Sequence, residues 1–376
     1  MRVLVVTNDF PPRVGGINYY IDQIVRRFPP GDVTVFASSW PEAEVFDAGF
    51  PQKVVRWSSR TMLPTSAVEN RVVEVIGSEK PDVVLFGAAV PLGLMGPAIV
   101  KRTGVPYAAF THGVEVACAI VPGGRTIMRR IGRGASLLTA VSDWTRKIIE
   151  PVAHCPAPMH LLPAGIDAET FRPDISDAEI RARHGLDGKP VVCCVSRLVA
   201  RKGQDQIVRA LPAIARKIPE VRFLIVGSGP YEATLRKLAR KHAVEDRVIF
   251  TGQVSYDDLP LYFRAGDVFA MPCRSRFFGL EVEALGAVFT QASAVGRPCV
   301  GGDSGGAPEA VRDGETGLVV NSRSVAGIGR AIIALLEDPA LAAKMGEAGA
   351  EWVHRELTWE AVAGNLAAML AEVVEK

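Results

Sequence analysis

The sequence contains few of the residues that build a metal centre or a disulfide scaffold. Its 376 residues include 6 cysteines and 6 histidines, and neither type recurs at the C-x-x-C or H-x-x-x-H spacing of a zinc site. No D-x-D pattern occurs, so no acidic pair of that kind is offered to a divalent cation. We therefore expect reduced cysteines in a cytoplasmic protein, and a function that requires neither a metal nor another cofactor.

The sequence also lacks a strong net charge and a long apolar helix. Because 43 Lys and Arg stand against 41 Asp and Glu, the formal charge is only +2, which argues against nucleic acid as the main partner. Residues 83–100 carry no charge, but three glycines and two prolines interrupt them. We expect a strand, a turn and a helix there instead of a membrane span. The apolar share of 48% is ample for a large core.

Short β-branched segments alternate with longer amphipathic segments, a pattern typical of parallel sheets covered by helices. In the first half this predicts strands at 2–7, 32–37, 53–56, 82–86, 107–110, 136–141 and 158–162, with helices at 17–27, 66–78, 92–102 and 142–149. In the second half it predicts strands at 190–195, 221–226, 247–250, 267–271 and 298–301, with helices at 204–218, 231–242, 256–265, 284–295, 323–337 and 359–374.

A domain boundary is expected near the middle of the chain, where Pro163, Gly165 and Pro173 separate a strand from a polar segment. The alternation on either side predicts an α/β protein with two facing, doubly wound, Rossmann-like domains at 1–165 and 166–355. A final helix within 356–376 is expected to pack back on the first domain. Ligands of such sheets bind beyond the carboxyl ends of the strands, so we expect the site in an interdomain cleft.

Two strand ends of the first domain carry candidate ligand-binding residues. Gly15 and Gly16 follow the first strand and precede a helix, where a bare backbone and a helix N-terminus both favour an anion. His112 follows the strand 107–110, a position suited to a cleft. An ordinary loop and a structural histidine are the alternatives.

The second domain offers a cationic loop and an acidic segment. Arg197 and Lys202 follow the strand 190–195, and a guanidinium together with an ammonium suits a diphosphate. Glu283 and Gln291 are eight residues apart, a little over two helical turns, so one helix could turn both toward a ligand. A solvated loop and a solvated helix face are the alternatives.

One segment also fits a different enzyme class. Residues 302–306 satisfy the G-x-S-x-G pattern of serine hydrolases, and Asp338 and His354 lie downstream. However, no H-G-G-G segment supplies an oxyanion hole. Pro308 and Glu309 are more typical of a turn that binds an anion or a hydroxyl, so we expect no hydrolase.

Together these segments resemble glycosyltransferases of family 4, which have the GT-B fold. The resemblance covers nearly the whole chain and depends on the order and spacing of Gly15-Gly16, Pro163 to Asp167, Ser196 to Leu198, Arg201 to Gly203, Gly227 to Pro230, Phe250 to Gly252 and Ser304 to Glu309. Within the family the chain most resembles actinobacterial phosphatidylinositol monomannoside mannosyltransferases, through Thr7 to Pro12, Met62 to Pro64, Phe86 to Ala89, Arg129 to Gly132 and Ala270 to Arg276.

The resemblance implies a retaining enzyme of phospholipid mannoside synthesis, which moves mannose from GDP-mannose to an inositol hydroxyl of phosphatidylinositol monomannoside. It assigns the first domain to the acceptor and the second to the nucleotide sugar. The implied catalytic residues are His112, Glu283, Arg197 and Lys202. The implied donor-binding residues are Gly16, Arg197, Lys202, Gly252, Val254, Glu283, Ala287, Val288 and Gln291, and the acceptor-side residues are Asp9, Gly15 and Asn18. Arg197 and Lys202, instead of a metal, would neutralise the departing diphosphate.

Three departures from the family pattern are visible. Gln291 stands where the family has the second acid of its E-x7-E motif, Phe277 and Phe278 stand where similar enzymes have glycines, and Val114 replaces a histidine. An amide offers only one oxygen to the two ribose hydroxyls, which implies altered nucleotide binding. Another donor or acceptor, a nucleotide-sugar 2-epimerase and a non-catalytic sugar-nucleotide binder remain alternatives.

A lipid acceptor implies contact with a membrane. Residues 123–134 form a basic amphipathic segment suited to an anionic surface, with Arg125, Arg129, Arg130 and Arg133 beside Ile127, Met128 and Ile131. A solvated helix with an inward apolar stripe has the same pattern. We expect a cytoplasmic enzyme held peripherally at the inner face of the cell membrane, with a nucleotide sugar and a lipid-linked acceptor as partners.

Overall fold

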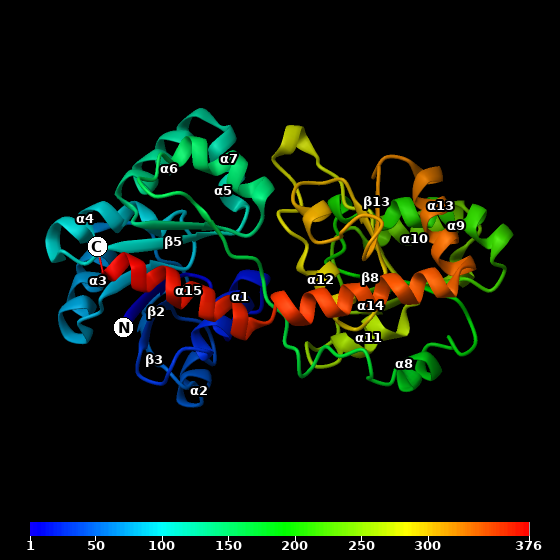
Figure 1. Cartoon of the computed structure of the whole chain (residues 1–376), viewed down its shortest axis with the longest axis horizontal. Helices are drawn as coiled ribbons and strands as arrows, with labels where there is room; N and C mark the ends of the chain where they lie inside the picture. Colours follow the sequence, from blue (N-terminus) through cyan, green and yellow to red (C-terminus); the bar gives the residue numbers. More distant parts are fainter. Residues whose placement is uncertain (376) are drawn as a thin grey trace. The chain divides into compact units, whose positions relative to one another are not determined.

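The computed structural model describes residues 1–375, which form two compact units. The first unit contains Met1–Gly165 and the chain from Trp359 onward, and the second contains Ile166–Thr358. Each unit consists of a parallel sheet surrounded by helices (Figure 1). The chain crosses between the units twice, after Gly165 and before Trp359. These two residues are in close contact, because a Cβ added to Gly165 would lie 2.7 Å from the Trp359 ring.

The first unit has a seven-stranded sheet in the order β3-β2-β1-β4-β5-β6-β7, with parallel pairs throughout. Its strands are β1 (Val3–Thr7), β2 (Val33–Ser38), β3 (Lys53–Trp57), β4 (Val83–Phe86), β5 (Tyr107–Thr111), β6 (Leu137–Ala140) and β7 (His160–Leu161). The central strands β1, β4 and β5 are buried along their whole length, because helices cover both faces.

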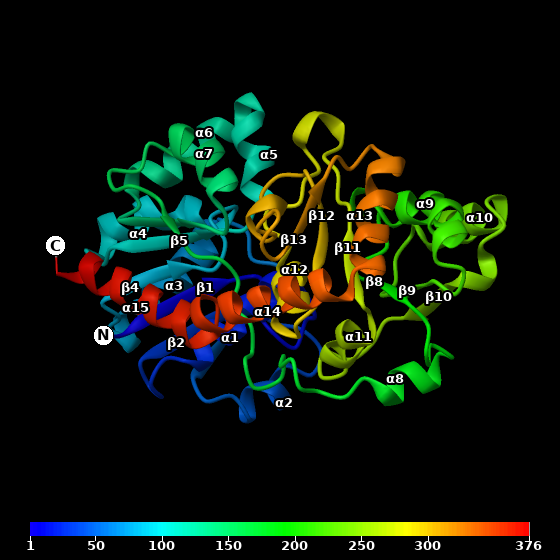
Figure 2. The ribbon, with the colours of Figure 1, turned by 45° about the vertical axis from the view of Figure 1, so that its right-hand side comes forward.

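The helices of the first unit are α1 (Gly16–Arg26), α2 (Ala43–Ala48), α3 (Ser66–Glu79), α4 (Gly96–Thr103), α5 (Val114–Ile120), α6 (Pro122–Gly134), α7 (Asp143–Ala153) and α15 (Trp359–Val374), with a 3-10 turn η1 (Leu92–Met95). The C-terminal helix α15 lies alongside α1 (Figures 1 and 2). Its side chains Val362, Leu366 and Leu370 share a buried cluster with Ile21 and Ile24 of α1. The last helix therefore completes the core of the first unit.

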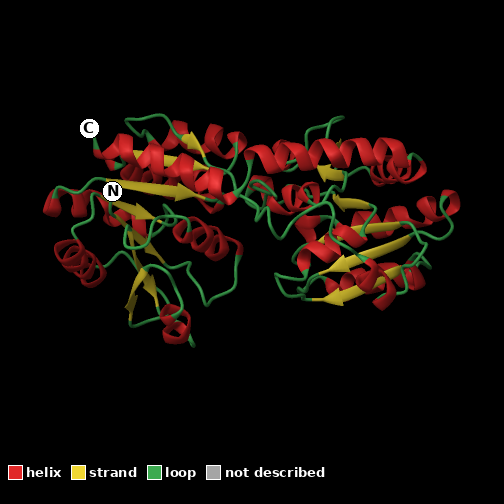
Figure 3. Ribbon diagram, turned by 60° about the horizontal axis from the view of Figure 1, so that its bottom comes forward, coloured by secondary structure: helices red, strands yellow, loops and turns green. Residues whose placement is uncertain are grey.

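The second unit has a six-stranded parallel sheet in the order β10-β9-β8-β11-β12-β13 (Figure 3). Its strands are β8 (Val191–Val195), β9 (Arg222–Val226), β10 (Val248–Gly252), β11 (Val268–Met271), β12 (Cys299–Gly302) and β13 (Gly317–Val320). Its helices are α8 (Ala178–Arg183), α9 (Gln204–Lys217), α10 (Glu232–Lys241), α11 (Leu259–Ala265), α12 (Ala287–Ala294), α13 (Val325–Glu337) and α14 (Pro339–Glu356), with 3-10 turns η2 (Ala200–Lys202), η3 (Glu245–Arg247), η4 (Phe277–Gly279) and η5 (Ala307–Glu309).

The prediction of two doubly wound, Rossmann-like sheets is confirmed. Three elements of the second unit were not predicted: α8, β13 and α14. In α14 the many alanines and glycines give only a weak apolar period. The helix predicted from residue 284 begins at Ala287 instead. Gly286 precedes it with φ at 85°, a left-handed conformation that stops the helix from extending toward Glu283.

Within residues 1–375, no helix is long and apolar enough to cross a bilayer. The uncharged stretch 83–100 divides into β4, the turn η1 and most of α4, as its glycines and prolines predict.

Candidate functional site

Each sheet has one point where the strand order reverses, and the candidate residues gather there. In the first unit the reversal lies between β1 and β4, and in the second between β8 and β11. The loops that leave the paired strands at such a point diverge, so a crevice opens at the carboxyl edge. Arg197 and Lys202 follow β8, and Glu283 follows β11. The predicted cationic loop and the predicted acidic residue therefore follow two neighbouring strands of one sheet.

A carboxylate and two cations bridge the crevice of the second unit. Lys202 Nζ lies 2.6 Å from Glu283 Oε2, and Arg201 Nη1 lies 2.8 Å from the same oxygen. Although burial alone would raise the pKa of Glu283, Lys202 and Arg201 hold it below its ordinary value. The carboxylate therefore stays ionised. Sequence reasoning identified Glu283 and Lys202, but it did not predict that they pair or that Arg201 joins them.

The backbone around Glu283 is fixed by the turn that follows β12. The Glu283 N–H donates to Ser304 Oγ at 3.2 Å, and its carbonyl accepts the N–H of Gly306 at 2.9 Å. Both contacts to the Glu283 carboxylate use Oε2. For Oε1 the structure of residues 1–375 gives no hydrogen-bond partner, and that oxygen is not sealed from solvent. Glu283 thus holds one oxygen ready to accept a hydrogen bond from a ligand.

Arg197 differs from most arginines of the chain, because its guanidinium makes no ion pair or hydrogen bond within the described residues. The side chain is exposed, while its carbonyl is tied to Gln204 Nε2 at 3.3 Å. Gln204 is fully buried at the start of α9 and also donates to Ser196 Oγ at 2.8 Å. Gln204 therefore fixes the backbone of the loop, while the guanidinium of Arg197 remains free to bind an anion.

The other donor-side candidates, apart from Gly16, lie in the same unit. Gln291, Ala287 and Val288 are half-buried on α12, and the Gln291 amide has no partner among residues 1–375. Gly252 ends β10 with φ at 74°, and its carbonyl accepts the N–H of Gly227 at 2.8 Å. Val254 packs against the core beyond it. Because Glu283 precedes α12, it does not share a helix face with Gln291, and the single-helix explanation of their spacing is wrong.

In the first unit His112 is held with one ring nitrogen available. Its Nε2 lies 2.8 Å from the carbonyl oxygen of Gly87, which can only accept, so Nε2 carries the proton and Nδ1 is an acceptor. The Tyr20 ring stands edge-on at 4.9 Å and the Phe110 ring at 5.9 Å between centroids. Burial lowers the pKa of His112 to about 4, so the imidazole is neutral near pH 7.

A residue that sequence reasoning missed shapes the loop of His112. Glu115 Oε2 accepts the N–H groups of His112 and Gly113 at 3.0 and 3.2 Å. The side chain is 1% exposed, and its second oxygen has no protein partner within the described chain. Burial raises the pKa of Glu115 above its ordinary value. The signal was the acid three residues after His112, a spacing at which a side chain reaches back to the loop N–H groups.

The loop after β1 presents backbone and one carboxylate. Gly16 is exposed, and a Cβ added there would meet nothing within 4 Å. Gly15 is more confined, because its Cβ would lie 2.8 Å from Asn18 Oδ1. Asn18 is 3% exposed and donates to the Phe10 carbonyl at 3.2 Å, so it supports the loop from below. Burial raises the pKa of Asp9 against the opposing effect of Arg13.

The structure gives no support to a serine hydrolase. Ser304 is fully buried and its hydroxyl is bonded to Glu283 N and Ser275 Oγ. Asp338 caps α14 through Leu341 N, and His354 Nε2 contacts the Ala294 carbonyl. Neither residue reaches Ser304. No cluster of three metal-ligating side chains occurs in the part of the chain that is described; that the protein needs no metal stays a prediction.

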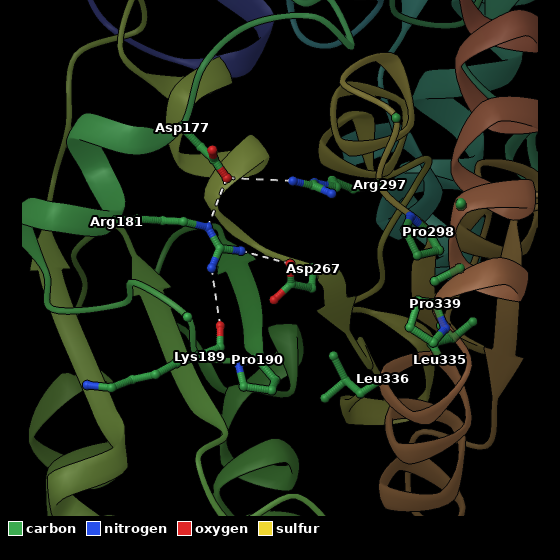
Figure 4. Close-up of a pocket in the computed structure, with 14 residues that line it drawn as sticks. Asp177, Arg181, Lys189, Pro190, Asp267, Arg297, Pro298, Leu335, Leu336 and Pro339 are labelled. Atoms are coloured by element: carbon green, nitrogen blue, oxygen red, sulfur yellow. Dashed lines mark hydrogen bonds and ion pairs between the residues drawn. The ribbon is translucent and has the colours of Figure 1, made fainter.

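A cavity of about 560 Å³ lies at the opposite, amino edge of the second sheet, beside Pro190, Asp267 and Pro298 (Figure 4). Arg181 donates to Asp177 and Asp267 at 2.9 and 2.8 Å across it. Arg297 also approaches Asp177, at 3.7 Å. These charges pair with one another, so the residues around the cavity are explained by ion pairs that attach α8 to the sheet.

The basic segment of α6 presents charge without apolar groups. Met128 and Ile131 are fully buried in the core, so the apolar stripe points inward, as in the alternative of a solvated helix, and contact with a membrane stays a prediction. The four arginines of α6 are exposed, and within residues 1–375 none has an ion pair: Arg125, Arg129, Arg130 and Arg133. The exposed side chains Ile120 and Val121 adjoin them.

Known proteins match the whole chain. The family described as Glycosyltransferase Family 4 matches residues 14–170, and Glycosyl transferases group 1 matches 176–352. A GDP-mannose-dependent alpha-(1-6)-phosphatidylinositol monomannoside mannosyltransferase of Mycobacterium tuberculosis is 45% identical over 98% of each chain. A GDP-mannose-dependent monoacylated alpha-(1-6)-phosphatidylinositol monomannoside mannosyltransferase of Corynebacterium glutamicum is 40% identical over 98% of this chain and 97% of its own. The crystal structure of Anabaena HepE in complex with UDP has the same fold, with a TM-score of 0.83 and 19% identity over 99% of this chain and 100% of its own.

Proposed function

This chain belongs to family 4 of the glycosyltransferases and has their GT-B fold, and we propose that it transfers mannose from GDP-mannose to an inositol hydroxyl of phosphatidylinositol monomannoside. The relatives named for that activity match nearly the whole chain at 40–45% identity. The observation that carries the proposal is the ion pair of Lys202 and Glu283, which follow the neighbouring strands β8 and β11, with the exposed Arg197 on the same loop as Lys202.

We assign the leaving group to the cations of this crevice. Departure of GDP places negative charge on the diphosphate, and the guanidinium of Arg197 together with the ammonium of Lys202 would stabilise that charge in the transition state. Arg197 can form a forked contact, while Lys202 supplies a point charge. The N–H of Gly16, at the start of α1, is assigned to a phosphate oxygen. On this proposal neither a metal nor another cofactor is required.

We assign the sugar to Glu283 and His112. Glu283 Oε1 would accept a mannose hydroxyl, and the free Nδ1 of the neutral His112 would accept another. In this assignment both residues hydrogen-bond the sugar and neither attacks it, so the proposed substitution occurs on one face of the sugar and retains its configuration. Gly252, Val254, Ala287, Val288 and Gln291 are assigned to the nucleoside, and Asp9, Gly15 and Asn18 to the acceptor side.

We further propose that the enzyme acts in the cytoplasm, held peripherally at the inner face of the membrane. The exposed and unpaired arginines of α6 support this, because each Lys or Arg near an anionic leaflet contributes about 1 kcal/mol. The expected result is salt-sensitive binding to phosphatidylglycerol vesicles that weakens when Arg125, Arg129 and Arg130 become glutamine. Equal binding by that variant would contradict the assignment of α6.

A donor and acceptor screen tests the proposed reaction. Purified enzyme is incubated with GDP-mannose, GDP-glucose or UDP-glucose and a membrane lipid extract, and the lipids are examined by mass spectrometry. We expect one added hexose on phosphatidylinositol monomannoside with GDP-mannose only. Turnover of the donor without acceptor would favour a 2-epimerase, and binding without GDP release would favour a non-catalytic binder.

The ribose assignment of Gln291 has its own test. Gln291→Glu restores two carboxylate oxygens at this position, so it should change GDP-mannose affinity by about tenfold, since a charged hydrogen bond contributes about 1.5–3 kcal/mol. Unchanged affinity in Gln291→Glu would remove the residue from the donor site.

A further inference from the structure

The turn after β11 exposes two phenylalanines side by side. Phe278 is 105% exposed and Phe277 57%, and Leu280 beside them is 46% exposed. In Figures 1 and 2 this turn, drawn in yellow, projects from the body of the second unit. Single exposed apolar side chains are ordinary on a protein surface, but adjacent exposed rings at a projecting point form a contiguous apolar patch, and such patches mark interaction sites.

The backbone of this turn is held in place at an energetic disadvantage. Phe277 and Phe278 have φ at 48° and 55°, the left-handed region in which a side chain costs about 1–2 kcal/mol per residue. The turn is nevertheless closed by backbone hydrogen bonds between Arg276 and Glu281, at 2.9 and 3.2 Å. Glycine would adopt this conformation without strain. The two rings are therefore exposed at a cost in backbone strain, and burial in the core does not offset that cost.

The charges at the base of the turn are neutralised locally. Arg276 pairs with Glu281 at 3.1 Å and its guanidinium lies 4.7 Å from the centroid of the Phe277 ring. Arg274 forms a forked pair with Asp205 at 2.8 and 3.1 Å, so its charge is also neutralised. The tip therefore presents apolar surface with no net charge of its own.

We propose that the tip formed by Phe277, Phe278 and Leu280 inserts into the apolar region of a phospholipid surface. This inference rests on the proposed function, in which the acceptor is a lipid. Two aromatic side chains bury roughly 300–500 Å², about half of what one partner contributes to a stable protein interface. A protruding tip also lacks the flat or concave surroundings of such an interface. A lipid surface needs no matching shape, and aromatic and aliphatic side chains enter it readily.

The double variant Phe277→Gly/Phe278→Gly tests this insertion without threatening the fold. Glycine relieves the left-handed strain, so the thermal midpoint should be unchanged or raised. Partition to phosphatidylcholine and phosphatidylglycerol vesicles, measured by co-sedimentation without donor or acceptor, should fall about tenfold or more. The loss should persist at high salt, because no charge is removed. Val45→Ser, which removes an exposed valine of α2, should bind vesicles like the wild type.

Two results would overturn the inference. Vesicle partition equal to that of the wild type would show that the rings do not enter lipid. Weaker GDP-mannose binding with unchanged partition would show that the turn closes over the donor instead. Since partition is measured without substrates, a failure of the proposed transfer reaction would leave this result unaffected.

Discussion

At the scale of single residues, each unit contains groups that its fold leaves available to a ligand. Glu283 uses one oxygen for Lys202 and Arg201, and within residues 1–375 its other oxygen has no protein partner. Gly16 leaves open space where any other residue would place a Cβ. His112 keeps one ring nitrogen as an acceptor. Each of these features can be altered without removing a core side chain, so binding and stability can be tested separately.

Gly16→Ala should separate these two properties. The added methyl meets open space, and replacing glycine by alanine in a helix stabilises by about 0.4–1 kcal/mol. The same methyl would obstruct a phosphate approaching the Gly16 N–H, so GDP-mannose affinity should fall about tenfold. Gly77→Ala in α3, another open helical glycine, should show the stabilisation alone. Unfolding in urea and donor titration measure the two quantities, and unchanged donor affinity in Gly16→Ala would contradict the phosphate role.

The neutral state of His112 should appear as pH-dependent stability. Its pKa of about 4 in the folded protein lies below the value near 6.5 of an unfolded chain, so the unfolded state binds the proton first. Stability should therefore be lost as pH falls from about 6.5 toward 4, by about 1.4 kcal/mol per pH unit, and be unaffected above that range. Urea unfolding of wild type and His112→Gln measures this difference in slope. Parallel pH profiles would show that His112 titrates normally.

At the scale of elements, the first residue of α15 is connected to His112 through α1. The Trp359 ring stands edge-on to Tyr20 at 5.4 Å, and Tyr20 stands edge-on to His112 at 4.9 Å. The Tyr20 hydroxyl donates to the Leu162 carbonyl at 3.0 Å, just before the chain leaves the first unit. Tyr20 is thus a positioning residue that ties the orientation of His112 to both chain connections.

Substitutions of Tyr20 should distinguish ring packing from the hydroxyl. Tyr20→Phe keeps the ring against His112 and leaves a buried carbonyl unpaired, so it should cost about 1–3 kcal/mol of stability with kcat retained. Tyr20→Leu removes the ring contact and should lower kcat at least about tenfold with little change in donor KM. Equal kcat in the two variants would show that His112 does not need the Tyr20 ring.

The sequence predicted the elements better than their contacts. The strand ends carrying Arg197, Lys202 and His112 followed from apolar runs and the loops after them. The pairing of Lys202 with Glu283 could not be foreseen, because it depends on β8 and β11 being neighbours in the sheet. The inward stripe of α6 was ambiguous for a similar reason: an apolar helix face looks the same whether it meets a core or a membrane.

At the scale of the whole molecule, the chain crosses between its units twice, and α15 returns to the first unit. Ending the chain at Thr358 would remove Trp359, Leu366 and Leu370 from a buried cluster, at a cost of several kcal/mol. We expect rapid proteolysis within residues 1–165 and survival of a fragment from the second unit, measured by limited proteolysis with mass spectrometry. A chain ended at Val374 should resist like the wild type. Equal resistance of the shorter chain would contradict a structural role for α15.

The central claim is that this chain couples release of GDP to formation of one mannosyl bond on a phospholipid acceptor. The most direct measurement follows GDP and mannolipid together, with purified phosphatidylinositol monomannoside and GDP-mannose as the only substrates. We predict equal amounts of GDP and singly mannosylated product, and loss of both in Arg197→Ala, whose guanidinium supports no other contact in the described structure. GDP released without mannolipid, or mannolipid formed at an undiminished rate by Arg197→Ala, would contradict the account.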